Sequence, residues 1–212
     1  MARLRIEAIA SFISFEEKVV DIGCDHAYLA IYLMQNEMCQ KVLATDIHEN
    51  ALLQAKKNIR KVGLEKKIPT LLSDGFTNIT EDVDTAVISG MGTSTILHII
   101  KDTQPKGIKK YILQANNDLY LLRTSLEKLG YFLEQEKIVY EKGHYYVIGL
   151  YTLSGKRLTL REKYFGKYDV KQISYYKDMH QNLSFIYKQI RFKEMKKKVK
   201  IYIQLQLLKK YL

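Results

Sequence analysis

The stretch VVDIGCDHAYLAIYL, from Val19 to Leu33, decides the fold because strand character gives way to helix character within a few residues. It starts with the short apolar run of a buried strand and continues with apolar residues at helical spacing. A single glycine lies at the junction, together with the acidic residues Asp21 and Asp25. A buried strand that turns directly into a helix is the first half of a βα unit.

The same alternation continues along the chain. Short apolar runs predict five strands, at 18–22, 41–46, 68–75, 84–92 and 109–116. Amphipathic spacing predicts helices at 4–15, 26–36, 49–63, 93–102 and 118–130. Residues 131–153 consist of two extended runs around Lys142-Gly143, which is typical of a hairpin. This order predicts an α/β fold of Rossmann-like type, with a mostly parallel sheet and an antiparallel edge hairpin.

The chain changes character at Ser154-Gly155, which we take as a domain boundary between residues 1–154 and 155–212. A heptad-like apolar stripe follows at Ile173, Tyr176, His180, Leu183, Tyr187 and Ile190. A second apolar set occurs at Val199, Ile201, Tyr202, Ile203, Leu205 and Leu208. We expect two helices that fold back on each other and bury both stripes, giving a small α-helical, coiled-coil-like C-terminal domain.

Positive charge is concentrated in this second part of the chain. The whole chain has a formal net charge of +11, and residues 156–212 contain 16 Lys and Arg against four Asp and Glu. A lysine-rich composition alone does not explain why acidic residues become rare only there. A strongly basic segment suggests a polyanionic partner such as nucleic acid.

Several other protein classes are disfavoured. No apolar run approaches the length of a membrane span, and charges interrupt the first residues, unlike a signal peptide. Cys24 and Cys39 are too few for a disulfide framework and lack zinc-ligand spacing. We therefore expect a cytoplasmic protein without a metal. Cys24 opens a helix, but no partner base is evident, so we interpret it as a small side chain at a tight turn.

Ligands of open α/β sheets bind beyond the carboxyl ends of the strands, and here those ends are acidic or rich in glycine. They carry Asp21, Gly23, Asp46, Asp74, Gly75, Gly90, Met91 and Gly92. A dinucleotide needs G-x-G-x-x-G at the first turn, but this turn reads GCDHAY, with Asp25 in place of the second glycine. A carboxylate there would repel a pyrophosphate, and the chain also lacks a P-loop sequence.

S-adenosylmethionine, a nucleoside with a positive charge and no phosphate, suits these acids better. Asp21 and Asp25 can serve its cationic amino-acid end, and Gly23 lets the backbone come close. Asp46 lies 25 residues after Asp21, near the ~20-residue offset of an acid that binds a ribose. The first two strand ends therefore favour this cofactor.

The next two strand ends extend the interpretation. Asp74 can accept a hydrogen bond from the adenine amino group, and Gly75 leaves room for the ring. Gly90 and Gly92 permit close approach to the transferred methyl group or to an incoming base. An Asp at a strand end is also a common cap or turn residue, so no single acid is decisive. Their occurrence at three consecutive strand ends is what favours a cofactor site.

Further candidates near the strand ends each have a structural alternative. His26 either caps the helix or hydrogen-bonds the cofactor carboxylate. Tyr28 is either ordinary core or an aromatic ring that stacks on a base. Gln114 and Asn116 either contact a base edge or form a turn that leads into a helix. The candidate cofactor contacts are completed by Arg3, Cys24, Ile47 and Met91.

Five strings in this order, DIGCDHAYL, SDGF, ISGMG, LQANN and YEKGHYYVI, resemble the bacterial tRNA (adenine(22)-N1)-methyltransferase family of TrmK type. The resemblance covers residues 1–153, whereas the tail matches only in length and helical character. DIGxDHA together with GMG is fairly specific to that family, because other methyltransferases favour several glycines in the first loop. The sequence departs from the family pattern at Thr93, which replaces a glycine, and at Ala115, which replaces a proline.

The resemblance implies a class I methyltransferase domain that uses S-adenosylmethionine to methylate N1 of adenosine 22 in the D-arm of tRNA. For that chemistry the candidate catalytic residues are Asp25, Tyr28, Gln114 and Asn116. Asp25 would stabilise the cationic product, Tyr28 would stack on the base, and the two amides would contact the base edge. The basic tail would bind tRNA by its shape and phosphates. We expect a monomer that acts without a metal or a membrane.

Other interpretations remain open at this point. The chain can be another S-adenosylmethionine-dependent enzyme, acting on a different RNA or on a small molecule, although the basic tail disfavours a small molecule. It can also be a catalytically silent RNA-binding module on a methyltransferase fold, which the departures at Thr93 and Ala115 permit. A membrane-surface role for the Lys- and Tyr-rich helices is weaker, because their apolar stripe is needed for helix packing.

Overall fold

A computed structural model describes residues 3–103 and 107–212 of the chain. The chain divides into two compact units, Met1–Lys156 and Arg157–Leu212. The division falls next to Ser154-Gly155, where the composition of the sequence changes. The two units are therefore described one after the other.

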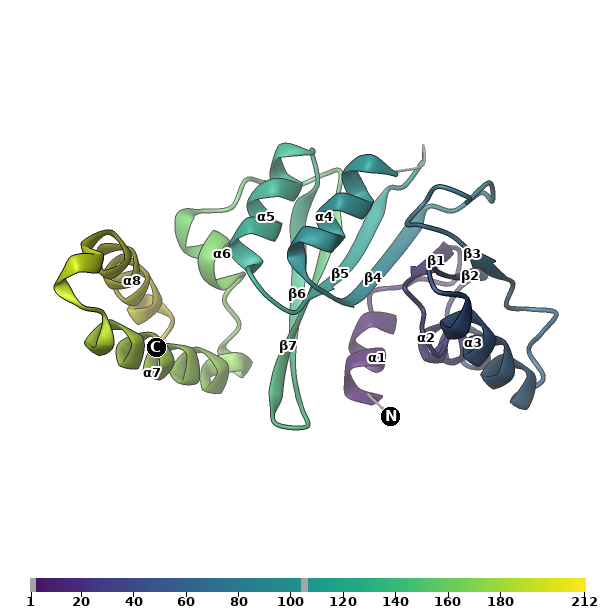
Figure 1. Cartoon of the computed structure of the whole chain (residues 1–212), viewed down its shortest axis with the longest axis horizontal. Coiled ribbons are helices and arrows are strands. Elements are labelled where there is room, and N and C mark those ends of the chain that lie inside the picture. The colour runs from purple at the N-terminus through teal and green to yellow at the C-terminus, as the bar shows by residue number, and fades with distance from the viewer. Residues whose placement is uncertain (1–2, 104–106) are drawn as a thin grey trace. The chain divides into compact units, whose positions relative to one another are not determined.

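The first unit is built on one seven-stranded sheet in the order β3-β2-β1-β4-β5-β7-β6 (Figure 1). Strands β1 to β5 pair in parallel, whereas β7 runs antiparallel to both β5 and β6. The strands are β1 (Lys18–Ile22), β2 (Lys41–Asp46), β3 (Thr70–Leu72), β4 (Thr85–Met91), β5 (Lys110–Ala115), β6 (Phe132–Glu141) and β7 (His144–Thr152). The predicted fold class is confirmed. Because the strand order reverses between β1 and β4, a ligand is expected beyond the carboxyl ends of these strands.

Helices cover both faces of this sheet. The helices of the first unit are α1 (Arg3–Ala10), α2 (Tyr28–Gln35), α3 (Glu49–Lys61), α4 (Thr93–Asp102) and α5 (Leu119–Lys128). Val87 and Ile112 belong to the buried cluster that α1, α2 and α3 form with the sheet. Their neighbours Ile88 and Leu113 point to the opposite face and are equally buried. The central strands are thus apolar on both sides, as their continuous apolar runs in the sequence predict.

The local sequence explains where these helices begin and end. Helix α3 has Glu49 in its first turn and Arg60 and Lys61 in its last, which complements the helix dipole. Helix α5 begins after Asp118, whose side chain accepts a hydrogen bond from the backbone N–H of Leu121 at 3.0 Å. Charges and caps of this kind fix the helices at the strand ends.

Strand β3 is shorter than the sequence predicts. The strand expected at 68–75 ends at Leu72. Beyond it, Ser73 Oγ donates to the backbone oxygen of Gly75 at 2.9 Å and turns the chain. A side chain that binds its own backbone two residues on is typical of a turn and competes with strand pairing.

The β6–β7 hairpin extends beyond the carboxyl end of β5. Gln114 of β5 pairs with Ile148, but β7 begins four residues earlier, at His144. Helix α1 is attached at the same place, because the backbone N–H of Leu4 donates to Glu141 Oε1 at 3.1 Å. The hairpin tip and the start of α1 therefore border the edge of the sheet where a ligand is expected.

The second unit is helical, as predicted. It contains α6 (Leu160–Phe165), α7 (Ile173–Gln189) and α8 (Met195–Leu208), and α7 packs against α8. Tyr176, Leu205, Leu208 and Tyr211 are buried in its interior. The hydroxyl of Tyr211 donates to the backbone oxygen of Gly166 at 2.8 Å, which fixes the last turn of the chain to the end of α6.

One expectation about this unit is wrong. Leu205 and Leu208 of the second apolar set are buried, but Val199, Tyr202 and Ile203 are 42–50% exposed. Helices α6 and α7 pack against α8 but leave these three side chains partly uncovered. The unit therefore presents apolar and aromatic side chains beside its lysines.

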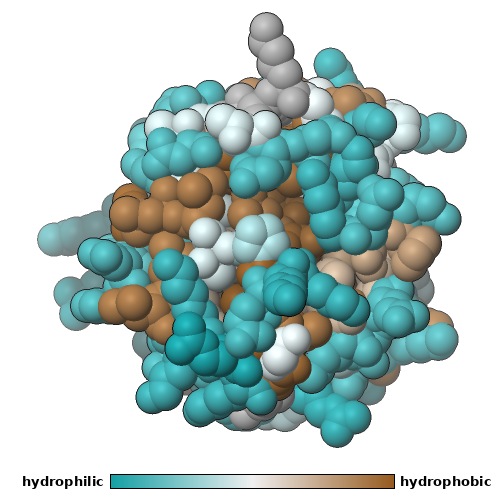
Figure 2. Space-filling view, turned by 90° about the vertical axis from the view of Figure 1, so that its right-hand side faces the viewer, coloured by the Kyte–Doolittle hydropathy of each residue, from teal (hydrophilic) through white to brown (hydrophobic). Residues whose placement is uncertain are grey.

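The surface of the molecule is mixed in polarity. Figure 2 shows apolar patches between hydrophilic side chains on one face. Exposed apolar side chains of the first unit include Phe15, Ile47, Leu53 and Leu72. Within residues 3–103 and 107–212, every helix is too short or too polar to cross a membrane.

A buried ion pair provides a test of this fold. Arg123 of α5 is 2% exposed, and its Nε donates to Glu136 Oε1 of β6 at 3.1 Å. Arg123→Met would leave that carboxylate buried without its counter-charge, so we expect the free energy of unfolding to fall by about 3–5 kcal/mol. Urea denaturation followed by circular dichroism measures the change.

Lys128→Met, at an exposed position of the same helix, is the matched control. It should change the free energy of unfolding by less than about 0.5 kcal/mol. Equal effects of Arg123→Met and Lys128→Met would contradict a structural role for the buried pair.

Candidate functional site

The carboxyl ends of β1 and β2 bring two acidic side chains together. Asp21 lies in β1, Asp46 ends the neighbouring β2, and the two residues are only 6% and 7% exposed. Asp46 accepts hydrogen bonds from the backbone N–H groups of Asp25 at 3.1 Å and His48 at 2.9 Å. It thereby ties the β1–α2 turn to the β2–α3 turn. Each of its oxygens keeps a second lone pair that a ribose hydroxyl can use.

Asp21 is the more perturbed of these two acids. Burial, with the nearby Asp46 carboxylate adding to it, raises the pKa of Asp21 to about 7. Both causes disfavour the charged form of the carboxyl group. A cationic ligand beside Asp21 would favour that form again, so the position is suited to an ammonium or sulfonium group.

The turn between β1 and α2 follows an uncommon backbone path. Gly23, Asp25 and Ala27 have φ values of 74°, 47° and 55°, in the left-handed region. At Gly23 the positive φ favours glycine, and a Cβ atom there would also meet the Cε atom of Met91, so the end of that side chain would have to move. Helix α2 consequently begins at Tyr28, two residues later than the sequence predicts.

Cys24 is buried in this turn, and its backbone N–H donates to the oxygen of Thr45 at 2.9 Å. Burial, followed by the carboxylates of Asp21, Asp46 and Asp25, raises the pKa of its thiol far above the usual range. A protonated thiol is a poor nucleophile. The structure therefore agrees with the interpretation of Cys24 as a small side chain at a tight turn.

His26 and Tyr28 stack on each other, with ring centroids 5.2 Å apart. His26 does not cap α2, because the N-cap residue is Ala27 and it makes no side-chain cap bond. Nε2 of His26 lies 3.4 Å from Oδ2 of Asp25, and its Nδ1 is buried without a hydrogen-bond partner among the described residues. Asp25 and Tyr28 are exposed. The three side chains thus border the open side of the turn, as a ligand site requires.

The third strand end differs from the expectation. Asp74 is exposed in the turn that follows β3. Gly75 has a φ of 55°, and a Cβ atom on it would overlap Thr103 Oγ1, directly after α4. The glycine is therefore needed for local packing, and the room that it leaves for a ring stays a prediction. Ile47, directly after Asp46, is 53% exposed and offers apolar surface to the face of a base.

Strand β4 bulges at Gly90, where its register against β5 shifts between Ser89 and Met91. Gly90 has a φ of 83°, and the position that its Cβ would take is open. Gln114 Oε1 accepts the backbone N–H of Gly90 at 3.1 Å, and Asn116 Nδ2 donates to the Gly90 oxygen at 2.8 Å. The two predicted amide side chains therefore hold the bulge.

The Oε1 and Nε2 atoms of Gln114 bind other groups of the protein. It is 1% exposed, and its Oε1 also accepts from Ser89 Oγ and from Nη1 of Arg5, each at 3.3 Å. Its Nε2 donates to Asn116 Oδ1 at 3.1 Å. The structure thus gives Gln114 a supporting position, whereas Asn116 is exposed at the edge of the sheet.

The two arginines of α1 contact different parts of the molecule. Arg3 pairs with Glu7 one turn along the helix, and its side chain is 81% exposed. Arg5, which the sequence analysis did not single out, reaches Gln114 of β5. Helical spacing gave no signal for Arg5, because its partner lies more than 100 residues away in the sequence.

Thr93, one of the two departures from the family pattern, has a structural use. Its backbone N–H donates to Asn117 Oδ1 at 2.9 Å, and its Oγ1 donates to the Asn117 oxygen at 2.5 Å. The threonine joins the start of α4, beside Gly92, to the loop after β5. Ala115, the other departure, is buried at the end of β5.

The combined geometry fits S-adenosylmethionine. Three features lie together at the carboxyl ends of the strands. Asp21 is buried and its charged form would be stabilised by a cation, and Asp46 on the neighbouring strand can bind a ribose. The backbone at Gly90 is open to a ligand. Among residues 3–103 and 107–212, no group of three His, Cys, Asp or Glu side chains is placed to hold a metal ion.

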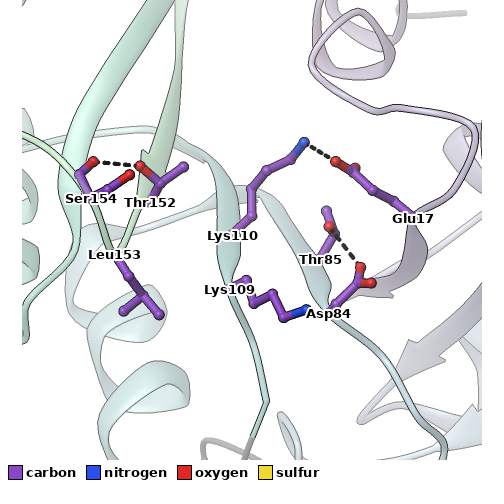
Figure 3. Close-up of a pocket in the computed structure, with 8 residues that line it drawn as sticks. All are labelled: Glu17, Asp84, Thr85, Lys109, Lys110, Thr152, Leu153 and Ser154. Atoms are coloured by element: carbon purple, nitrogen blue, oxygen red, sulfur yellow. Dashed lines mark hydrogen bonds and ion pairs between the residues drawn. The ribbon is translucent and has the colours of Figure 1, made fainter.

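A cavity of about 490 Å³ lies elsewhere, lined by residues at the amino ends of β4 and β5 (Figure 3). Two contacts between lining residues occur there. Lys110 is paired with Glu17, and Thr85 Oγ1 donates to Asp84 Oδ1 at 3.1 Å. Because this cavity lies at the opposite ends of the strands from Asp21 and Gly90, we do not assign it to the cofactor.

Comparisons with known proteins point to one family. The family model described as a methyltransferase domain matches residues 2–148. A Bacillus subtilis protein named tRNA (adenine(22)-N(1))-methyltransferase is 33% identical over 147 residues. The match covers 68% of this chain and 62% of that relative, so the chain spans less than two thirds of its length.

Solved structures cover nearly the whole chain. TrmK from M. capricolum, in complex with S-adenosyl-homocysteine, is 32% identical with a TM-score of 0.85, covering 98% of this chain and 96% of that one. A Streptococcus pneumoniae protein in complex with S-adenosyl-L-methionine is 27% identical with a TM-score of 0.87, and the match covers both chains completely. The likeness therefore includes the C-terminal helices.

The raised pKa of Asp21 predicts an unusual dependence of stability on pH. In the folded, cofactor-free protein this carboxyl group keeps its proton up to a pH of about 7, whereas in the unfolded chain it loses it near 3.8. The folded state binds more protons in this window, so the free energy of unfolding falls as the pH rises from about 4 to about 7. Asp21→Asn should remove the loss and stabilise the protein at pH 8 by up to about 4 kcal/mol.

Urea denaturation at pH 4, 6 and 8 measures this difference. Glu16→Gln, at an exposed position, is the control and should follow the wild type at each pH. Asp21→Asn and the wild type differ in their free energy of unfolding by some amount at each pH. If this difference is the same at pH 4 and pH 8, the pKa of Asp21 is not raised in the folded protein.

Proposed function

Since the chain belongs to the class I methyltransferase family, and within it to the TrmK-type tRNA methyltransferases, we propose that it transfers a methyl group from S-adenosylmethionine to N1 of an adenosine in tRNA. Adenosine 22 in the D-arm is the proposed target, because the Bacillus subtilis relative is named for that position. The proposal also takes support from the acidic side chains of the site itself.

The buried carboxyl groups of Asp21 and Asp46 carry this proposal. Two adjacent acids at the first two strand ends would repel a phosphate-bearing nucleotide and attract a cationic nucleoside. Asp21 would bind the ammonium group at the amino-acid end of the cofactor, and His26 would donate a hydrogen bond to the carboxylate of the cofactor. Asp46 would accept from the ribose hydroxyls, and Ile47 would cover the face of the adenine.

The remaining candidate contacts have more peripheral positions. Asp74 would accept from the adenine amino group from its exposed turn. Gly23 and Met91 would bring the ends of β1 and β4 against the cofactor, and Gly90 would leave space for the target base. Arg3 and Cys24 complete the proposed set, and the side chain of Arg3 is exposed whereas that of Cys24 is buried.

When bound, S-adenosylmethionine supplies an electrophilic methyl group attached to a sulfonium. N1 of adenine has a free lone pair once the base is unpaired, so no side chain has to remove a proton before attack. The chain's own residues have to hold that nitrogen in line with the methyl group, which is an effect of positioning. Tyr28 would stack on the base, Asn116 would contact its edge, and the exposed carboxylate of Asp25 would stabilise the cationic product.

The C-terminal unit is the proposed tRNA-binding domain. The unit contains 15 Lys and Arg between residues 157 and 212, together with exposed aromatic rings such as Tyr202. Phosphate contacts supply affinity for a structured RNA, and aromatic side chains can stack on unpaired bases. We propose that the protein acts in the cytoplasm, where its proposed substrate tRNA is found. We propose a monomer, because a single chain contains both the cofactor-binding unit and the tRNA-binding unit.

A methylation assay tests the proposed reaction. Unmodified tRNA is incubated with the protein and cofactor that carries a labelled methyl group, and the modified nucleotide is mapped. We expect one labelled methyl group on N1 of adenosine 22, and none on a tRNA with uridine at that position. Asp46→Ala should weaken cofactor binding by roughly tenfold or more in calorimetry, since it removes a charge-assisted hydrogen bond.

A protein that binds the cofactor but labels no RNA would be the silent module considered above. Label at another nucleotide would retain the methyltransferase and reject the proposed target.

The lysines of α8 and the segment before it provide a second test. Lys193, Lys196 and Lys200 are exposed and lie three and four residues apart, on one side of the chain. Changing all three to Gln should weaken tRNA binding and reduce the salt dependence of the binding constant by up to about 2–3 in the log–log slope. Fluorescence anisotropy over a range of salt concentrations measures this slope.

The matched control changes Lys56, Lys57 and Lys61 of α3 to Gln, which removes the same charge from exposed positions of the first unit. It should leave the slope close to that of the wild type. An equal reduction by both triple variants would mean that net charge, rather than the C-terminal unit, governs tRNA binding.

A further inference from the structure

Arg5 joins three elements at the edge of the sheet where the target base is proposed to lie. Its Nη1 donates to Gln114 Oε1 of β5 at 3.3 Å. Its guanidinium carbon lies 4.9 Å from the centroid of the Tyr146 ring, which belongs to β7. An arginine held by an aromatic face and by a hydrogen bond loses little further freedom when it acts on a neighbouring group.

The orientation of the two amides follows from groups that cannot exchange roles. The backbone N–H of Gly90 can only donate, so the Gln114 atom that faces it at 3.1 Å is Oε1. Arg5 is also only a donor and faces the same oxygen. The Nε2 of Gln114 must then face Asn116, and it donates to Oδ1 at 3.1 Å. The Nδ2 of Asn116 is left for the Gly90 oxygen, at 2.8 Å, which can only accept.

The hydrogen bonds from Arg5 to Gln114 and from Gln114 to Asn116 form a relay. This relay determines which atom Asn116 can present to a ligand. Gln114 is 1% exposed, whereas Asn116 is exposed beside the open backbone of Gly90. The Oδ1 of Asn116 accepts one bond from Gln114 and keeps a second lone pair. Adenine has an amino group next to N1 and can donate to such an acceptor. Guanine has an oxygen in that place and would be repelled.

We propose that Arg5 is a positioning residue that locks the Gln114–Asn116 relay, so that Asn116 presents a hydrogen-bond acceptor to the 6-amino group of the target adenine. The proposal rests on the proposed function and adds to it the residue that sets base specificity. A bond from a guanidinium is stronger than one between neutral groups, so Arg5 stabilises the orientation in which Gln114 Oε1 faces it. Without Arg5 the backbone of Gly90 still favours this orientation but with one donor fewer on Gln114 Oε1, so both amides turn more often and Asn116 presents a donor part of the time.

The test couples the loss of Arg5 to the loss of the 6-amino group. A tRNA with purine riboside at the target position keeps N1 but has no amino group to donate. For each protein we take the ratio of kcat/KM on adenosine tRNA to kcat/KM on purine tRNA. We expect this ratio to be at least about fivefold larger for the wild type than for Arg5→Met. The intrinsic difference in reactivity of the two bases is the same for both proteins and cancels. An equal ratio for wild type and Arg5→Met overturns the proposal.

Two further variants sharpen this result. Arg5→Lys keeps the charge but has no planar fork, so its ratio should lie between those of the wild type and Arg5→Met. Arg60→Met removes an exposed arginine from α3 and should keep the wild-type ratio. A ratio for Arg60→Met as low as that for Arg5→Met would trace the effect to net charge and overturn the proposal.

A readout without RNA separates this proposal from the proposed function. In nuclear magnetic resonance of the folded protein, the side-chain amide protons of Gln114 should exchange slowly with water in the wild type. In Arg5→Met they should exchange at least about tenfold faster, because the relay opens more often. Unchanged exchange overturns the locking role of Arg5. A wild type that transfers no methyl group to tRNA, but shows the slow exchange, would reject the proposed function and keep the relay.

Discussion

The burial of Asp21 beside Asp46 is the constraint on which the site depends. Two carboxyl groups in neighbouring strands, each less than one-tenth exposed, cannot both be ionised cheaply in the absence of a counter-charge. The fold keeps them because the sheet is stabilised elsewhere, by strands buried on both faces. A cationic ligand would favour the charged form of these groups, and the first turn accordingly lacks the run of glycines that phosphate recognition needs.

The edge of the sheet is held together by side chains that span neighbouring elements. Asp46 ties two turns, Thr93 ties the start of α4 to the loop after β5, and Gln114 ties α1 to β4 and β5. Each of these polar groups is satisfied by backbone or side-chain partners, so the edge is rigid without being apolar. The proposed methyl transfer depends on alignment rather than on an acid or base, so it would benefit from such rigidity.

Much of the fold could be predicted from the sequence, because buried parallel strands and amphipathic helices leave strong periodic signals. The acids at the strand ends were predictable for the same reason, since parallel strands place their carboxyl ends together. Long-range side-chain contacts left no such signal. Arg5 and Gln114 meet only in the folded chain, Gly75 packs beside Thr103, 28 positions later, and the exposure of Tyr202 depends on how the helices of the second unit pack.

The left-handed turn after β1 also has a bearing on how the molecule is made. The backbone N–H of Asp25 is held by Asp46, a residue that leaves the ribosome 21 positions later. A nascent chain that ends before β2 contains the whole β1–α2 segment but lacks the acceptor that steadies its uncommon conformation. Binding of the nucleoside therefore requires the folded tertiary structure, and an isolated peptide with the sequence of the β1–α2 segment would not bind it.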